Sequence, residues 1–299
     1  RLILSLAITT SVSVGLSHLL ARLFRSPNNP ESALVTALIL FCLMAPPGDV
    51  KGALVLTGTV AFGAISKYFI AFRKKHLFNP AAAGAAFSSL ALGSLGGGAI
   101  WWVASPVLLP VIAVVGYVIL KKIRRFTLFF TFAGAAALTI LIVGASIPGY
   151  LTWASLPAIL WQTIASWPIV FFGAIMLTEP LTLPPTRRAQ IIYGLLVGML
   201  FGSPFHLGPI YATPENALLI GNIFSWLISP KTKLLLRLKE RRRLTPDVYH
   251  FSFARTTDYR YEPGQYLEWT LPHTRPDSRG VRRYFTIASS PTEGDLAMG

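Results

Sequence analysis

Cysteine and charged residues are scarce in this sequence. Cys42 is the only cysteine among 299 residues, and charged residues make up 13% of the chain. A single thiol excludes an internal disulfide bond and cannot ligate an iron–sulfur cluster on its own. Ordinary soluble domains contain roughly 25% charged residues, so the composition predicts a protein that is not wholly soluble.

Acidic residues are rarest in residues 1–230. That part holds fourteen Lys and Arg residues and four Asp and Glu residues, whereas residues 231–299 hold thirteen and eight. Apolar runs of about 20 residues without charge are typical of transmembrane helices. The sequence therefore predicts an α-helical membrane domain at 1–230, embedded in the lipid bilayer, and a soluble domain at 231–299. The net charge of +15 fits membrane topology better than a nucleic-acid partner, which we do not expect.

Nine apolar segments of the first domain are expected to span the membrane. They lie at residues 2–21, 32–46, 52–71, 80–95, 104–120, 126–145, 155–178, 189–203 and 214–229. Eleven of the fourteen basic residues lie in alternate connections, which the positive-inside rule places in the cytoplasm. The soluble domain follows on the same side. We therefore expect a multi-pass protein of the cytoplasmic (inner) membrane with its C-terminal domain in the cytoplasm.

Two pairs of prolines recur at an offset of 134 residues. Pro46 matches Pro180, Pro80 matches Pro214, and the sequence around each pair is similar. The matched segments run in opposite directions under the topology above. This predicts two inverted repeats of five helices, with nine spans in this sequence and a tenth before Arg1. Inverted repeats with short, proline-interrupted helices place a binding site near the middle of the membrane. The alternative is coincidence, because proline is common at helix starts.

Several polar residues near these prolines are candidates for that site. Asn79 and Pro80 are expected to begin a helix whose positive end would face an anionic or electron-rich ligand; the alternative is a simple N-cap. Lys67 lies near the cytoplasmic end of its helix, where the alternative is an ammonium group that reaches water. Glu179 and Glu215 lie at helix ends beside the second proline of each pair, where we expect them to be exposed.

Two segments resemble a family of membrane proteins that carry electrons through flavin. SKYFIAFRKKHLFNPAAAG (residues 66–84) and MLTEPLTLPPT (residues 176–186) are similar to signatures of the FMN-carrying membrane components of the sodium-translocating NADH:quinone reductase and of the Rnf complex. The resemblance implies about ten helices in two inverted repeats and electron transfer through flavin. The residues that it implies for a membrane flavin or quinone are Lys67, Asn79, Pro80, Thr178 and Glu179.

The sequence departs from that family at one motif. Family members attach FMN to a threonine in a Ser/Thr-Gly-Ala-Thr motif soon after the Asn-Pro helix. Here residues 90–106 read LALGSLGGGAIWWVASP, without threonine. The resemblance therefore implies a non-covalent FMN, riboflavin or quinone in the membrane domain, and not a phosphoester-linked FMN.

The pattern changes to short alternating segments from residue 231 onward. Residues 248–254, 265–271 and 282–289 are expected to be strands, with loops at 262–264 and 273–280. The sequence therefore predicts the first part of an antiparallel β-barrel, incomplete at Gly299.

Two motifs in this tail resemble the FAD-binding barrel of the ferredoxin–NADP reductase superfamily. They are PGQY (263–266) and RYFT (283–286) with a serine three residues later, similar to that family's Arg-x-Tyr/Phe-Ser/Thr-x-x-Ser box. The resemblance implies that Arg283 neutralises the FAD pyrophosphate, Phe285 packs on the flavin ring and Thr286 bonds near N5. The alternative is an ordinary amphipathic strand with a basic start. The residues implied for FAD are Pro263, Gly264, Gln265, Tyr266, Arg283, Tyr284, Phe285, Thr286 and Ser289.

These features predict a membrane flavoprotein that acts as a FAD-dependent NAD(P)H oxidoreductase. NAD(P)H, bound by a further domain expected after Gly299, would reduce FAD, and electrons would pass to a membrane flavin, a quinone or redox partner subunits. A haem reductase needs pairs of buried histidines. His18 is the only histidine in a predicted span, so we expect no haem. The alternative is a channel or transporter that the flavin domain regulates. No motif assigns a catalytic residue or a metal ligand.

Overall fold

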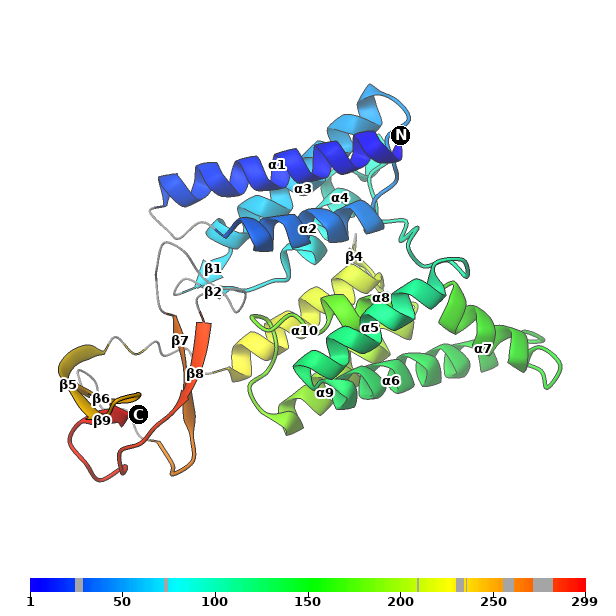
Figure 1. The fold of residues 1–299 in the computed structure, drawn as a ribbon. Helices are drawn as coiled ribbons and strands as arrows, with labels where there is room; N and C mark the ends of the chain where they lie inside the picture. The colour runs from blue at the N-terminus through cyan, green and yellow to red at the C-terminus, as the bar shows by residue number, and fades with distance from the viewer. Residues whose placement is uncertain are drawn as a thin grey trace. The chain divides into compact units, whose positions relative to one another are not determined.

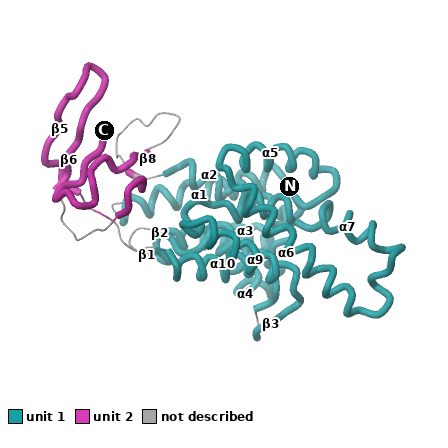
Figure 2. The backbone as a smooth tube through the Cα atoms, turned by 90° about the horizontal axis from the view of Figure 1, so that it is seen from below, with its two compact units in different colours: residues 1–230 teal, residues 231–299 magenta. Residues whose placement is uncertain are grey.

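The computed structural model of the chain describes residues 1–24, 29–72, 75–208, 210–229, 234, 236–254, 261–270 and 282–299. The chain divides into two compact units, Arg1–Pro230 and Lys231–Gly299 (Figure 2). The division coincides with the change from apolar to charged sequence. The first unit, unit 1, is mostly helical, and the second, unit 2, is built of strands (Figure 1).

Each of the nine predicted apolar segments of unit 1 corresponds to helix. The segment predicted at 155–178 is interrupted near Pro168, whose missing N–H group cannot continue a helical ladder, and then ends in a π-helical turn, η2 (Phe172–Met176). The helices are α1 (Leu2–Leu23), α2 (Pro30–Leu43), α3 (Val50–Phe69), α4 (Pro80–Ala91), α5 (Leu109–Ile123), α6 (Phe126–Ala145), α7 (Leu156–Ala165), α8 (Ile169–Phe171), α9 (Arg187–Gly202) and α10 (Pro214–Ile228).

The described residues contain three helices that are long and apolar enough to cross a membrane: α1, α3 and α6. The pair Leu156–Ala165 and Ile169–Met176 passes the same criteria as one span bent by 49°, which raises the number to four. The other helices are short. α4, for example, has 12 residues, whereas a perpendicular crossing needs about 20. The structure therefore supports a membrane protein and does not confirm nine or ten spans.

The proline repeat of the sequence corresponds to a repeated order of elements. In the first half, α3 is followed by the hairpin β1 (Ala71–Phe72) and β2 (Lys75–His76) and then by α4. In the second half, α9 is followed by the hairpin β3 (His206–Leu207) and β4 (Ile210–Tyr211) and then by α10. Pro80 and Pro214 are the first residues of α4 and α10. These two short helices pack against each other and join the halves.

Glycines allow the helices of unit 1 to approach closely. Gly194, Gly198 and Gly202 lie four residues apart on α9 and face α6. A Cβ atom on Gly198 would lie 2.5 Å from the Phe132 carbonyl oxygen. On α4, a Cβ atom on Gly84 would lie 2.7 Å from the Thr59 carbonyl oxygen of α3. Small residues at such spacing are typical of membrane helix interfaces, where close backbone packing replaces the hydrophobic effect.

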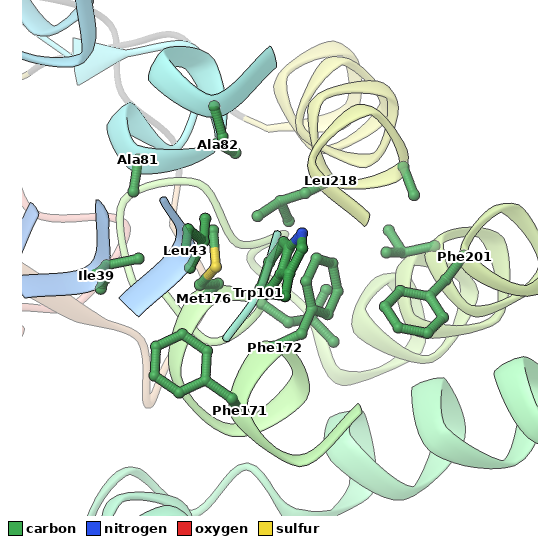
Figure 3. Packing of buried hydrophobic residues seen from close by; sticks show 14 of the residues in the cluster. Ile39, Leu43, Ala81, Ala82, Trp101, Phe171, Phe172, Met176, Phe201 and Leu218 are labelled. Carbon is green, nitrogen blue, oxygen red and sulfur yellow. The ribbon is translucent and has the colours of Figure 1, made fainter. Parts of the chain in front are cut away.

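The core of unit 1 is shared by the two halves. Figure 3 shows Leu43 of α2 and Leu218 of α10 near Trp101, whose indole lies by Met176 and Phe172. Trp101 lies in a loop that follows the short helix η1 (Gly93–Leu95) and returns to α2. Its backbone N–H group donates to the Leu43 carbonyl oxygen at 2.9 Å. The Val103 N–H group of the same loop donates to the Cys42 carbonyl oxygen at 3.4 Å.

Unit 2 contains two separate antiparallel sheets. The first has the order β5 (Arg237–Thr245), β6 (Val248–Ala254) and β9 (Leu296–Met298), and the second pairs β7 (Tyr266–Thr270) with β8 (Arg282–Thr286). Phe253, Tyr261, Ile287, Leu296 and Met298 form a small hydrophobic core. The described residues form no closed barrel, so the predicted barrel is not confirmed.

In unit 2, strand β8 ends earlier than predicted, and the long strand β5 was missed. β8 ends at Thr286, because the next residues turn toward the core, where Ile287 and Ser289 are buried. β5 was not predicted. All nine of its residues are exposed, so it lacks the alternation of apolar and polar side chains that identifies a half-buried strand. The predicted loop at 273–280 and the last residue of the predicted strand 265–271 lie outside the described residues.

Candidate functional site

Polar side chains from distant parts of unit 1 meet at the start of α4. Asn79 is buried, and its Oδ1 atom accepts from the Ala82 N–H group at 3.0 Å, which caps α4. Its own N–H group donates to Asn222 Oδ1 at 2.8 Å, and its Nδ2 atom donates to the Met176 carbonyl oxygen at 3.4 Å. Asn79 therefore ties its helix to α10 and to the end of η2. The predicted N-cap is confirmed, and it is also a contact between the two halves.

The network continues from Asn222 to Tyr193. Asn222 Nδ2 donates to the Tyr193 hydroxyl oxygen at 3.1 Å, and both residues are buried. A fully buried polar chain of this kind is stable only when its members satisfy one another. The sequence analysis missed both residues. The available signal for Asn222 was an amide in the apolar part of α10 that follows Asn216.

An acid–histidine pair lies beside this network. His76 Nε2 is 3.0 Å from Glu179 Oε1, and the two side chains are 10% and 22% exposed. The Thr182 hydroxyl donates to Glu179 Oε2 at 3.3 Å. The pair joins strand β2 of the first half to the segment after η2 in the second. Sequence reasoning placed His76 in a loop and did not connect it to Glu179, 103 residues away.

Lys67 does not simply extend to water. Its Nζ atom donates to the Ser32 carbonyl oxygen at 3.0 Å and lies 3.3 Å from the Ser32 hydroxyl oxygen, in the first turn of α2. Thr178 is buried, and its hydroxyl donates to the Ala174 carbonyl oxygen of η2 at 2.7 Å. The structure thus brings Asn79, Pro80 and Glu179 together around the Met176 carbonyl oxygen, whereas Lys67 bonds to α2 and the Thr178 hydroxyl bonds to the preceding turn.

A second buried acid lies at the start of α10. Glu215 is 2% exposed, and its Oε2 atom accepts from the Trp101 indole N–H group at 3.3 Å. The expectation that Glu215 would be exposed was therefore wrong. The first turn of α10 packs against the loop that carries Trp101, and this packing excludes water from a position that sequence alone places at a helix end. Acidic side chains inside a membrane domain are costly and mark functional candidates.

The polar cluster at the start of α4 does not have the form of an open cofactor site. The side-chain atoms of Asn79 and Asn222 are engaged with the Tyr193 hydroxyl group and with backbone groups. A cavity of about 130 Å³ lies elsewhere in unit 1, lined by Pro46, Gly52 and Leu56 among others. Ligand pockets of drug size have volumes of about 300 Å³ or more. This cavity is smaller, and none of the predicted site residues lines it.

In unit 2, the two predicted FAD motifs lie on paired strands. Tyr266 is opposite Thr286, Leu267 opposite Phe285 and Trp269 opposite Arg283. Tyr266 and Tyr284 are 66% and 63% exposed, and Thr286 is exposed as well, whereas Arg283 and Phe285 are half-buried. The Tyr266 and Tyr284 rings meet edge to face with centroids 5.7 Å apart. One face of the ladder therefore offers two aromatic rings and a hydroxyl group.

The remaining motif residues have structural contacts. Residues 263–264 form a turn that the Gln265 N–H group closes on the Glu262 carbonyl oxygen at 3.2 Å, and Gly264 has a φ of 88°, which favours glycine. Ser289 is buried, lies 2.8 Å from the Tyr261 hydroxyl oxygen and accepts from the Ala297 N–H group at 2.9 Å. Ser289 therefore anchors the chain after β8 to β9. Phe285 packs against the core of unit 2.

Comparison with known proteins gives no further assignment, because no protein-family model matches the sequence and no curated protein matches it.

Proposed function

We propose that this protein is a membrane-bound flavoprotein oxidoreductase. In this proposal, unit 2 holds FAD, NAD(P)H is the electron donor, and a quinone, a membrane flavin or a redox partner protein at unit 1 is the acceptor. FAD, when bound, accepts a hydride and releases single electrons. The proposal rests on the resemblance of the two motifs in unit 2 and on where the strands place them.

The observation that carries the proposal is the ladder between β7 and β8. The PGQY and RYFT motifs are separated by residues 267–282, yet the ladder aligns Tyr266 with Thr286. Two motifs that serve one ligand must lie side by side, whereas two chance matches need not. The pairing of β7 with β8 therefore supports a shared ligand for the two motifs, and the spacing of the motifs in the sequence does not give this support by itself.

The exposed face of this ladder suits a planar ring. The Tyr266 and Tyr284 rings supply aromatic surface, and Thr286 supplies a hydroxyl group that both donates and accepts. The resemblance gives ring stacking to Phe285, but this side chain packs against the core of unit 2. We therefore propose that Tyr284 stacks on the flavin ring. Arg283 lies on the opposite face of β8, and in this proposal its long side chain reaches around the edge of the two-stranded sheet to pair with phosphate oxygens.

The test is to purify the protein from membranes in mild detergent and to identify its bound cofactors by absorbance and mass spectrometry. We expect FAD at close to one equivalent per chain and NAD(P)H-dependent bleaching of its absorbance. Arg283→Gln should lower FAD retention by roughly ten-fold or more, because a charge-assisted bidentate contact is lost. Arg241→Gln, which removes the same charge from the exposed strand β5, is the matched control and should retain FAD.

Two further variants separate the aromatic assignments. Tyr284→Ala should weaken FAD retention more than Phe285→Leu, which keeps an apolar side chain in the core. The opposite ranking would return the stacking role to Phe285. Colourless protein that yields no flavin after extraction would overturn the proposal, and a Soret band would favour a haem enzyme instead.

A transport function is the second candidate, and the buried carboxyl group of Glu215 favours it. Ionisable residues in a membrane interior commonly lie on ion or proton pathways. The protein should then carry ions across proteoliposomes during NAD(P)H oxidation, and Glu215→Gln should abolish the ion flux while FAD remains bound. Oxidation without flux would leave the oxidoreductase proposal alone.

A further inference from the structure

The hairpin formed by β5 and β6 has a strongly basic, exposed first strand. β5 reads RLKERRRLT, with five basic residues and one acid, and all nine residues are exposed. It lies at the edge of its sheet, because the strand order is β5-β6-β9. An edge strand with this charge resists pairing with a further strand. Its surface therefore suits a partner that recognises side chains and not strand edges.

The charge is concentrated at the tip of the hairpin, which we define as residues 241–249. Arg241 and Arg243 lie beside the Tyr249 ring, with their Cζ atoms 5.4 and 5.8 Å from its centroid. Arg243 also donates from Nε to the Thr245 carbonyl oxygen at 3.1 Å and from Nη2 to the Pro246 carbonyl oxygen at 2.7 Å. These bonds hold the turn. The tip thus presents three consecutive arginines on an ordered hairpin, with Asp247 as its one acid.

The tip also exposes apolar side chains. Leu244, Val248 and Tyr249 are 53%, 43% and 36% exposed. Arginine together with tyrosine and aliphatic side chains is the composition of surfaces that lie in a lipid headgroup layer, where the aliphatic groups reach the acyl boundary. A nucleic acid would pair with the arginines but would leave the leucine and valine in water. The combination therefore favours an anionic membrane surface.

The linker limits how far this hairpin can lie from unit 1. Residues 229–236 join the end of α10 to the start of β5, and a chain of this length reaches at most about 30 Å when fully extended. Unit 1 carries the helices that could cross the membrane. A tether this short gives the hairpin a high effective concentration at the membrane surface, so even weak contacts would be populated.

We infer that the β5–β6 hairpin tip docks on anionic phospholipid headgroups of the bilayer that holds unit 1. Arg241, Arg242 and Arg243 pair with headgroup phosphates, and Leu244, Val248 and Tyr249 lie in the interfacial layer. The inference requires unit 1 to be in a bilayer. It does not require flavin, so it can fail while the oxidoreductase proposal holds.

The test uses the full chain in lipid nanodiscs of phosphatidylcholine, with or without phosphatidylglycerol. Val248→Cys, made on a Cys42→Ser background, carries an environment-sensitive fluorophore at the tip, and brominated lipids serve as quenchers. We expect a blue shift and quenching in discs that contain phosphatidylglycerol, and both signals should decrease with added salt. Replacing Arg241, Arg242 and Arg243 with glutamine should weaken the docking by at least about ten-fold.

Two matched variants control for folding and for general charge. Replacing the three arginines with lysine keeps the charge and should keep most of the quenching, even if the bonds that Arg243 makes in the turn are lost. Replacing Lys121, Lys122 and Arg124 at the end of α5 with glutamine removes the same charge elsewhere and should leave the tip signal unchanged. Equal quenching in neutral and anionic discs, or no quenching in either, would overturn the inference. Binding of labelled DNA that depends on the arginines, without quenching by lipid, would assign the tip to nucleic acid.

Discussion

Helices α4 and α10 begin in the same way, with a side-chain cap followed by proline, but the polar contacts at the two starts differ. Both helices begin with a proline after a side-chain cap, Asn79 in one and Thr213 in the other. Asn79 also bonds to Asn222 and to the Met176 carbonyl oxygen, all with neutral groups. Near the start of α10, two residues after its cap, the buried acid Glu215 bonds to Trp101. A repeated fold therefore does not repeat its polar contacts, and the two halves of unit 1 have specialised differently.

The largest effect is expected from a substitution at Gly84, whose counterpart in the second half, 134 residues later, is Leu218. Gly84→Leu places the residue of the second half at this position of the first half. Its Cβ atom would lie 2.7 Å from the Thr59 carbonyl oxygen. Because a backbone atom cannot move aside easily, we expect no folded protein in fluorescence-detected size-exclusion chromatography. The control is Gly134→Leu on α6, where nothing lies within 4 Å of the added carbon. Normal recovery of the Gly84 variant would show that α3 and α4 can separate.

The two caps should differ in their cost. Asn79→Ala removes the cap and the bond from Asn79 Nδ2 to the Met176 carbonyl oxygen, so we expect a loss of about 2 kcal/mol. Thr213→Ala removes only the cap bond to the Asn216 N–H group, with an expected loss of about 1 kcal/mol. Thermal unfolding in detergent, followed by intrinsic fluorescence, measures both. Equal losses would mean that the bond between Asn79 Nδ2 and the Met176 carbonyl oxygen adds no stability.

The buried acid of the second half gives a smaller, two-sided test. Glu215→Ala leaves the Trp101 indole without its acceptor and should cost about 2 kcal/mol. Glu215→Gln keeps an acceptor of the same shape and removes the cost of burying a charge, so its stability should stay within about 1 kcal/mol of the parent protein. The same unfolding assay applies to both. A severe loss in the glutamine variant would mean that the carboxylate pairs with a cation.

The smallest effect is expected at the exposed ion pair of unit 2. Lys239 Nζ is 2.6 Å from Asp295 Oδ2, and hydrogen bonding and attraction to this carboxylate raise the pKa of Lys239. A raised lysine pKa stabilises the fold at neutral pH and up to the ordinary lysine pKa, and this contribution disappears as the pH rises through the folded-state pKa. Because both groups are solvated, Lys239→Ala should cause no measurable change in unfolding at neutral pH. A clear loss would show that Asp295 needs this partner to hold β9.

The helices of unit 1 could be predicted because long apolar runs with few alternatives fix their positions. The interruption within 155–178 was missed because the segment stays apolar through Trp167 and Pro168. Apolar composition does not show where a helix axis changes direction. β5 was missed for the opposite reason, since its nine residues are all exposed and carry no alternating pattern. The number of membrane crossings depends on the length and tilt of each helix, and a hydropathy pattern fixes neither for short helices.

At the candidate site, the residues that could be predicted are those with a local role. Asn79 was found because its cap lies three residues away, whereas Asn222 and Tyr193 act across 143 and 29 residues. Glu215 was expected to be exposed because helix ends are usually solvated. The packing of the Trp101 loop, which the sequence does not reveal, excludes water there. The motif residues of unit 2 were identified, but the strand alternation that separates Tyr284 from Phe285 needed the ladder register.

Pro46 and Pro180 affect the structure because neither has a backbone N–H group to donate. Had α2 or η2 continued as α-helix, the next donors to the carbonyl oxygens of Cys42 and Met176 would be residues 46 and 180, and both are prolines without an N–H group. The Cys42 oxygen accepts from the distant Val103 N–H group, and the Met176 oxygen accepts from Asn79 Nδ2 as well as from the nearby Glu179 N–H group. Each proline thus leaves a carbonyl oxygen that can accept from a distant segment. A related sequence that keeps these two prolines would lack the same two helical donors.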